Sequence, residues 1–265
     1  EVFDEGDTRF FVLSCEQVQR LKDIMDETVS IFGRGNFPTI EVRLCHLVCI
    51  VRDKLAEGWI HIRDIRFGCS GASAVLAAEF NDSHNDIFYS DLDIIVNTDL
   101  PTRKSYEQVK TAVLGSLLEL LPPSVNRKRM LSSYLREAYV SNMVKIISHD
   151  SWCLISLGNN RSKAVDLIFV NNMKRKYEFS VDSFQIMLDA LFLFYQCRSR
   201  YSIIGQKGAS MYIGANCYPT VVGECMYGDY REALAHLQKK LLATHSLSLI
   251  HIWRCRRKER CRSRW

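Results

Sequence analysis

Residues 91 to 97 read DLDIIVN, and their apolar run after an acidic start is typical of a strand. Because successive side chains of a strand point to opposite faces, we expect Asp91 and Asp93 on one face, with Leu92 and Ile94 toward the core. Their Cα atoms would lie about 6.5 to 7 Å apart, so both carboxylates could reach one small cation. Without a cation they repel each other. The pair therefore indicates a metal site or, alternatively, an exposed strand edge.

A small-residue turn, GCSGAS, occupies residues 68 to 73, between a predicted strand at 61–67 and a short helix. Backbone amides in such a turn, together with the helix N-terminus, can bind phosphate, and the hydroxyl of Ser70 could add a donor. An ordinary N-capped turn is the alternative interpretation. The turn is not a Walker loop, because no Gly-Lys-Ser/Thr follows it.

Asp166 lies within the otherwise apolar stretch AVDLIFV, which predicts a strand at residues 164 to 170. Burying a lone carboxylate is costly unless it is paired or bound to a ligand. A third carboxylate on a neighbouring strand would complete a two-metal site, in which ions about 3.5 to 4 Å apart stabilise the attacking and leaving oxygens of an in-line displacement. A serine-containing turn, an acid pair and a later acidic strand, in this order, describe the palm of the polymerase-β-type nucleotidyltransferases.

Strand patterns are concentrated between about residues 60 and 170, and helical periodicity flanks them. One predicted helix begins after Ser14, which forms a capping box with Gln17. The pattern predicts an α+β fold in which a lobe with a mixed sheet lies beside a helical lobe. Further helices are expected at 40–57, 104–121, 134–147 (alone or with a strand), 182–196 and 229–244. The expected division is an N-terminal helical segment at 1–58, the palm at 59–175, a helical lobe at 176–246 and a basic tail at 247–265.

The net charge of +5 does not by itself indicate a nucleic-acid-binding body. Residues 247–265 contribute +6, which leaves about −1 for residues 1–246. This tail is either a basic arm or a non-native segment. Its sequence, LSLIHIWRCRRKERCRSRW, resembles translated adapter or vector sequence, which favours the second interpretation. The ten cysteines show neither CxxC pairs nor zinc spacing, which favours buried thiols in a reducing compartment. No apolar run is long enough for a membrane span, and the acidic start lacks a signal-peptide pattern.

Residues 9 to about 246 resemble the metazoan terminal nucleotidyltransferase 5 family (family with sequence similarity 46), which are cytoplasmic and nuclear poly(A) polymerases. The resemblance covers most of the chain, and its motifs are highly specific. It implies a two-lobed polymerase-β-type nucleotidyltransferase, with a mixed-sheet palm lobe, a helical lobe and the active site in the cleft between them. It is carried by the stretches RFFVLSCEQVQRL, IFGRGNFPTIEV, YSDLDIIV, LREAYV, SWCLISLGNN, YEFSVDSFQIMLDALFLF and YPTVVGECMYGDYREAL.

Within this resemblance, Asp91 and Asp93 match the family's metal-binding acid pair. Asp166 matches its third acid, where the family usually has the longer Glu. The family's Gly-Ser turn corresponds to Cys69 and Ser70, with Cys in place of Gly. The catalytic and metal-binding residues implied are therefore the three aspartates, and Ser70 is an implied nucleotide contact.

Three more nucleotide contacts are weaker candidates. Ser183 and Phe184 resemble the Ser-Tyr pair by which related polymerases touch the nucleotide, so that Ser183 would contact phosphate or ribose and Phe184 would stack on the base. Lys145 is a candidate triphosphate contact, although a solvated helical lysine is the default interpretation.

The resemblance implies addition of adenylates from ATP to the 3′ end of RNA, with Mg²⁺ or Mn²⁺ as cofactor, in the cytoplasm and also the nucleus. The expected partners are therefore ATP and an RNA 3′ end such as mRNA poly(A). Two alternatives stay open at this point. One is a catalytically weak scaffold that keeps the nucleotidyltransferase fold, and the other is a transferase of a different nucleotide.

Overall fold

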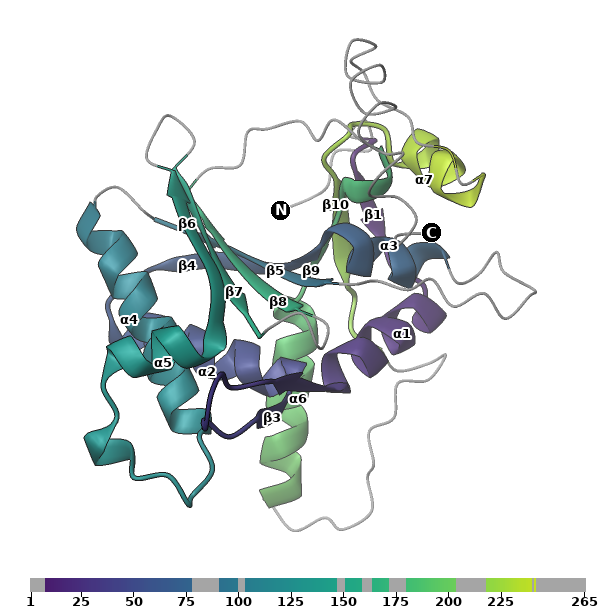
Figure 1. Ribbon diagram of the computed structural model, residues 1–265. Helices are drawn as coiled ribbons and strands as arrows, with labels where there is room; N and C mark the ends of the chain where they lie inside the picture. The colour runs from purple at the N-terminus through teal and green to yellow at the C-terminus, as the bar shows by residue number, and fades with distance from the viewer. Residues whose placement is uncertain are drawn as a thin grey trace.

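The computed structural model describes residues 8–77, 91–99, 103–146, 151–158, 164–171, 180–203, 218–239 and 241, and a mixed eight-stranded sheet runs through it (Figure 1). The strands follow the order β1-β10-β9-β4-β5-β8-β7-β6. The pair β5–β8 is parallel, and the other neighbours in this order are antiparallel. The strands are β1 (Phe10–Val12), β4 (Ile62–Gly68), β5 (Asp91–Thr98), β6 (Val140–Ile146), β7 (Trp152–Leu157), β8 (Ala164–Val170), β9 (Phe184–Met187) and β10 (Val222–Cys225).

Helices pack beneath one face of this sheet (Figure 1). Phe67, Val96 and Phe169 point to this side, and at most 1% of each is exposed, because helical side chains close over them. The face has the apolar alternation expected of strands that are buried on one side. The helices on this side are α1 (Cys15–Asp26), α2 (Leu44–Glu57), α4 (Arg103–Leu120), α5 (Ser132–Tyr139) and α6 (Asp189–Ile203).

Local sequence signals explain how several helices begin. The capping box predicted at α1 is confirmed: the Ser14 hydroxyl accepts from the Gln17 amide at 3.2 Å, and the Gln17 side chain accepts from the Ser14 amide at 2.9 Å. Asp229 caps α7 (Tyr230–Gln238) by accepting from the Glu232 amide at 3.0 Å. These bonds satisfy amides that have no partner inside the helix.

The helix predicted over 40–57 is correct from Leu44 onward, but its first four residues form a strand. β3 (Ile40–Arg43) pairs with β2 (Thr28–Ile31) in a separate two-stranded sheet, and α2 begins only at Leu44. Ile40 and Val42 are buried while Glu41 between them is exposed, a period of two that overrides the helical pattern.

The helix predicted over 182–196 is also corrected. Residues 184–187 form β9, α6 starts at Asp189, and β10 follows later in the chain. A short buried run such as FQIM cannot be told from a helix by periodicity alone. The sheet thus takes strands from the predicted N-terminal segment 1–58 and from the predicted helical lobe 176–246, as well as from the predicted palm 59–175. The predicted tail at 247–265 lies outside the described residues.

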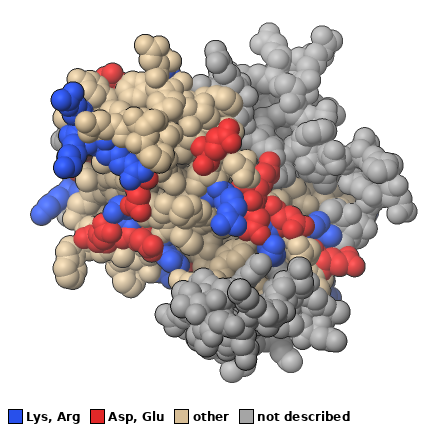
Figure 2. Space-filling model, turned by 90° about the horizontal axis from the view of Figure 1, so that it is seen from below, with Lys and Arg blue, Asp and Glu red and all other residues tan. Residues whose placement is uncertain are grey.

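The mixed α+β fold itself is confirmed. Among the described residues, no helix is both long enough and apolar enough to span a bilayer. The helical side of the molecule carries acidic and basic side chains close together (Figure 2). Lys54 pairs with Glu57 at 2.9 Å and with Glu119 at 3.3 Å, and Lys22 pairs with Asp26 at 2.8 Å.

Candidate functional site

The three aspartates meet on the sheet face opposite the helices. Asp93 on β5 is the direct partner of Asp166 on β8, and Gly68 on β4 flanks Asp93 on its other side. Neighbouring strands lie about 4.8 Å apart, so the two carboxylates start from adjacent positions. Asp91 precedes Asp93 by two residues and therefore points to the same face. The parallel register of β5 and β8 thus gathers the acids that the sequence singled out.

Burial and mutual repulsion make this cluster electrostatically unfavourable on its own. Desolvation, followed by repulsion from Asp166 and Asp91, raises the pKa of Asp93 to about 7. Desolvation also raises the pKa of Asp166, against the hydrogen bond from Ser156 on β7, which lowers it. Among the described residues, the Oδ1 atom of Asp166 is buried without a hydrogen-bond partner. A buried, unpartnered carboxylate oxygen beside two further acids is the donor set that a hard divalent cation satisfies.

The turn after β4 forms the edge of the cluster next to Asp93. Cys69 opens α3 (Cys69–Ala77) with a φ of +53°, a left-handed conformation that glycine adopts without strain. Its thiol donates a hydrogen bond to Asp93, which lowers the pKa of that carboxyl and partly offsets the raising effects. A glycine, which the resemblance led us to expect at this position, would adopt this backbone conformation without strain, whereas the cysteine adds a contact to Asp93.

Ser70 and Gly71 follow Cys69 and complete this turn. Gly71 packs against the ring of Phe67 so closely that a Cβ atom would lie 2.2 Å from ring carbon Cζ. α3 can therefore lie directly over the end of β4. Ser70 is half-buried in the first turn of α3, two residues after Gly68, which is level with Asp93. Ser70 thus follows Cys69, which contacts Asp93, and lies in the first turn of α3, at the helix N-terminus predicted to bind phosphate.

The other three predicted nucleotide contacts do not join the site. Lys145 is an exposed residue of the edge strand β6, not of a helix, and it pairs with Cys153 on β7. It lies three residues along the strand from Asn142, which is level with Asp166, so it points to the opposite face of the sheet. The triphosphate contact expected for Lys145 is therefore not supported by its position.

Ser183 and Phe184 are both fully buried, with 0% of each exposed. The Ser183 hydroxyl donates to the Ser180 carbonyl at 2.7 Å and lies 3.3 Å from the Cys225 sulfur. The Phe184 ring packs edge-to-face on Phe11 and Tyr230, with centroids 6.2 Å apart in both pairs. The base-stacking role expected for Phe184 stays a prediction that its position does not support, because the ring has no accessible surface. The buried Ser183 hydroxyl is hydrogen-bonded within its own turn.

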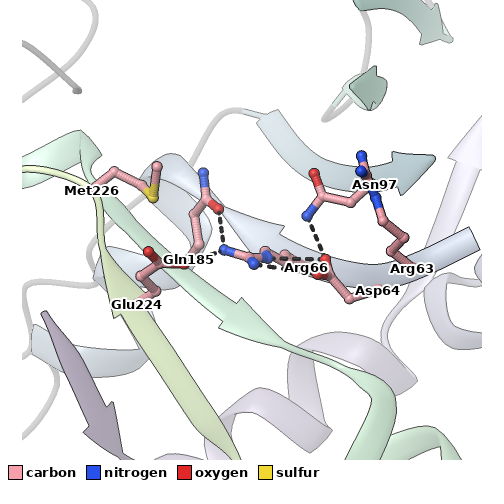
Figure 3. Close-up of a pocket in the computed structure, with 7 residues that line it drawn as sticks. All are labelled: Arg63, Asp64, Arg66, Asn97, Gln185, Glu224 and Met226. Atoms are coloured by element: carbon pink, nitrogen blue, oxygen red, sulfur yellow. Dashed lines mark hydrogen bonds and ion pairs between the residues drawn. The ribbon is translucent and has the colours of Figure 1, made fainter. Parts of the chain in front are cut away.

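A polar cavity of about 260 Å³ lies beside the acids on the same face, and the sequence interpretation missed it (Figure 3). At its centre Arg66 donates to Asp64 at 2.9 and 3.3 Å, to Glu224 at 2.6 Å and to Gln185 at 3.1 Å. The available signal was the alternation of Asp64 and Arg66 in the strand IRDIRFG, which puts two charges on the same face as Asp93. The lining residues are Arg63, Asp64, Arg66, Asn97, Gln185, Glu224 and Met226.

The family model described as nucleotidyltransferase matches residues 13–251. The chain belongs to this nucleotidyltransferase family. It is 43% identical over 236 residues to human terminal nucleotidyltransferase 5C, covering 89% of this chain and 56% of that protein. It is 42% identical to rat terminal nucleotidyltransferase 5C over 247 residues, which cover 91% of this chain and 59% of that protein. It is also 42% identical to human terminal nucleotidyltransferase 5D over 240 residues, which cover 90% of this chain and 58% of that protein.

The resemblance found in the sequence is therefore confirmed. The chain spans somewhat more than half the length of the curated relatives that it matches. The nucleotidyltransferase match includes the three aspartates, the turn at Ser70 and all strands of the sheet except β1.

Proposed function

We propose that this chain carries the nucleotidyl-transfer site of an RNA 3′-end adenylyltransferase that uses ATP. The observation that supports it most directly is the gathering of Asp91, Asp93 and Asp166 on one sheet face, beside a helix N-terminus that carries Ser70. The relatives are named terminal nucleotidyltransferases, which supports a nucleotide as the transferred group and a chain end as the acceptor.

The acids fit a divalent metal, which we propose to be Mg²⁺ or Mn²⁺. The unpartnered Asp166 oxygen and the raised pKa of Asp93 both reflect negative charge that protein groups do not neutralise. Among the described residues, no three His, Cys, Asp or Glu side chains are already arranged around one metal position. Asp91, Asp93 and Asp166 would hold the ion, which when bound would supply positive charge to the reacting phosphate.

Each element of the site then has a task in the transfer. The amides at the start of α3 and the Ser70 hydroxyl bind the triphosphate of ATP. Asp166 accepts the proton of the RNA 3′-hydroxyl, directly or through water, as that oxygen attacks the α-phosphorus. A bond forms between the 3′-oxygen and phosphorus, the α–β phosphoanhydride bond breaks, and pyrophosphate leaves in line with the attack. The product is an RNA one adenylate longer.

A primer-extension assay tests this proposal with purified protein, a labelled oligo(A) primer, each of the four nucleotides and Mg²⁺ or Mn²⁺. We expect extension with ATP, and its loss in the Asp91→Ala, Asp93→Ala double variant. The matched control is Asp23→Ala, Asp53→Ala, which removes two exposed acids on the helical side. Equal extension by the wild type and the Asp91/Asp93 variant would overturn the proposal, and preference for another nucleotide would replace ATP.

A scaffold without activity is separated from an enzyme by metal binding. We expect Mn²⁺ to raise the melting temperature of the wild-type chain but not that of the Asp91→Ala, Asp93→Ala variant. A chain that neither extends the primer nor gains stability from Mn²⁺ would be a scaffold that keeps only the fold.

A further inference from the structure

We infer that the Arg66 cavity holds the 3′-terminal nucleoside of the acceptor RNA. The inference rests on the proposed function, because it assigns the second substrate of the same site. The cavity opens on the face that carries the acids, and its walls are side chains of β4, β5, β9 and β10 and of Met226, just beyond β10 (Figure 3).

The charges of the cavity favour a neutral, polar ligand. Two arginines and two carboxylates line it, so their formal charges cancel. Arg66 is held by Asp64 and by Glu224, with Arg66 14% and Glu224 11% exposed, so its charge is already neutralised by protein groups. A phosphate would be repelled by the two carboxylates, and a cation would be repelled by the two arginines. A nucleoside has no charge and presents hydrogen-bond donors and acceptors, which suits these walls.

The polar groups of the cavity are held in fixed orientations before any ligand binds. Arg66 donates to the Gln185 amide oxygen at 3.1 Å and so sets the direction of that side chain. Asn97 donates from Nδ2 to Asp64, which Arg66 also holds. Because these residues lie on paired strands, the cavity is preorganised and little conformational entropy is lost when a base is bound. The thioether of Met226 adds a polarisable surface at one end.

The position of the cavity selects the acceptor over the incoming nucleotide. Along β4 the order is Asp64 and Arg66 in the cavity, Gly68 level with Asp93, and then the turn with Ser70. On the antiparallel β5, Asn97 lies at the cavity end. In-line displacement places the attacking oxygen opposite the leaving pyrophosphate. If the triphosphate binds at the turn, the acceptor approaches from the side of the cavity, with the acids between the two.

Binding measurements in EDTA test the assignment without turnover. The probes are a 15-nucleotide oligo(A) with a 5′ dye and the same oligomer with an abasic 3′-terminal nucleotide. We expect the wild-type chain to bind the intact oligomer about three- to tenfold more tightly, as one or two neutral hydrogen bonds would give. In Asn97→Ala and in Gln185→Ala this ratio should approach one. The ratio is insensitive to a partly unfolded fraction, because that fraction lowers the binding of both oligomers equally.

The matched control is Gln108→Ala on α4, which removes an amide that donates to the Gly58 carbonyl on the helical side. It should keep the wild-type ratio. In primer extension, Asn97→Ala should raise the KM for oligo(A) about three- to tenfold and leave the KM for ATP within about twofold. A rise in the KM for ATP instead, or an unchanged preference for the intact 3′ end in both cavity variants, would overturn the assignment. Lack of extension by the wild type would count against the proposed function, and the binding ratio would still decide the cavity.

Discussion

The two faces of the central sheet are built from the same strands, but one face is apolar and buried and the other carries acidic side chains. On β5, Leu92, Ile94 and Val96 point to the helices and are at most 1% exposed, while the alternate residues Asp91 and Asp93 point to the other side and are only partly buried. The apolar face gains stability from burial. The acidic face loses stability, because its carboxylates are desolvated and repel one another. Burial of the apolar face therefore supplies the free energy that keeps the carboxylates of the acidic face close together despite their repulsion.

The largest effect should come from removing an acid without disturbing the opposite face. We expect Asp166→Ala to reduce primer extension by about a thousandfold or more, because the variant loses both a ligand of the metal and the acceptor of the 3′-hydroxyl proton. The melting temperature in EDTA should not fall below that of the wild type, because the repulsion between Asp166 and Asp93 is removed. If the Asp166→Ala variant extends the primer at more than about a tenth of the wild-type rate, Asp166 is not needed for nucleotide transfer.

A core substitution should show the reverse pattern. Phe169 is the next residue of β8 to point to the helices after Leu167, and it is fully buried. Phe169→Ala should destabilise the chain by about 3 to 5 kcal/mol, from lost burial and the cavity that remains. Urea denaturation measures the change, and primer extension at 10 °C should retain activity in the folded fraction. A loss below about 1 kcal/mol would mean that the two faces contribute similarly to stability.

Asp93→Asn should stabilise the metal-free protein. The pKa of this carboxyl is raised to about 7 in the folded chain, against about 3.9 in an unfolded one. Stability in EDTA should therefore fall as the pH rises from about 4 to about 7, and the neutral amide removes that loss. At pH 8 we expect Asp93→Asn to melt a few degrees higher than the wild type. The difference should shrink at pH 5, and a lower melting temperature at pH 8 would contradict the repulsion.

Cys69→Gly should have a smaller effect, which separates backbone strain from side-chain contact. Relief of the left-handed backbone at Cys69 should contribute about 1 kcal/mol. The lost thiol hydrogen bond to Asp93 should raise the pKa of that carboxyl further. Cys69→Ser keeps a donor and the strain, and serves as the control. Equal melting temperatures for Cys69→Gly and Cys69→Ser would show that the strain is negligible.

The smallest effect is expected at Lys145, an exposed residue that points away from the acids. Lys145→Ala should change stability by less than about 0.5 kcal/mol and leave the KM for ATP unchanged. A rise of several-fold in that KM would restore the triphosphate role expected from the sequence.

The sequence was most informative where a pattern is local. The alternation in DLDIIVN and AVDLIFV was sufficient to predict two strands and the face on which each acid lies, and the capping box predicted the start of α1. The pairing of Asp93 with Asp166 was expected only as a contact between neighbouring strands, since register is set by tertiary packing.

Misses occurred where long-range packing overrides local pattern. Phe184 lies in a short apolar run that is equally compatible with a helix, and only its place between Phe11 and Tyr230 shows that it belongs to the core. In the Arg66 cavity only the alternation of Asp64 and Arg66 is local, and Gln185 and Glu224 come from distant parts of the chain. The sequence therefore contains a signal for the charged pair on β4 but none for the cavity that the distant residues complete.

The parallel pairing of β5 and β8 also has a kinetic consequence. Parallel strands cannot be joined by a tight hairpin, and here the chain between positions 93 and 166 contributes α4, α5, β6 and β7 before it returns. Closing so long a loop costs entropy before its contacts are gained, so this pairing should form late in folding. A partly folded chain would therefore hold the two halves of the acid cluster apart. Recovery of nucleotide transfer during refolding should lag behind the formation of secondary structure.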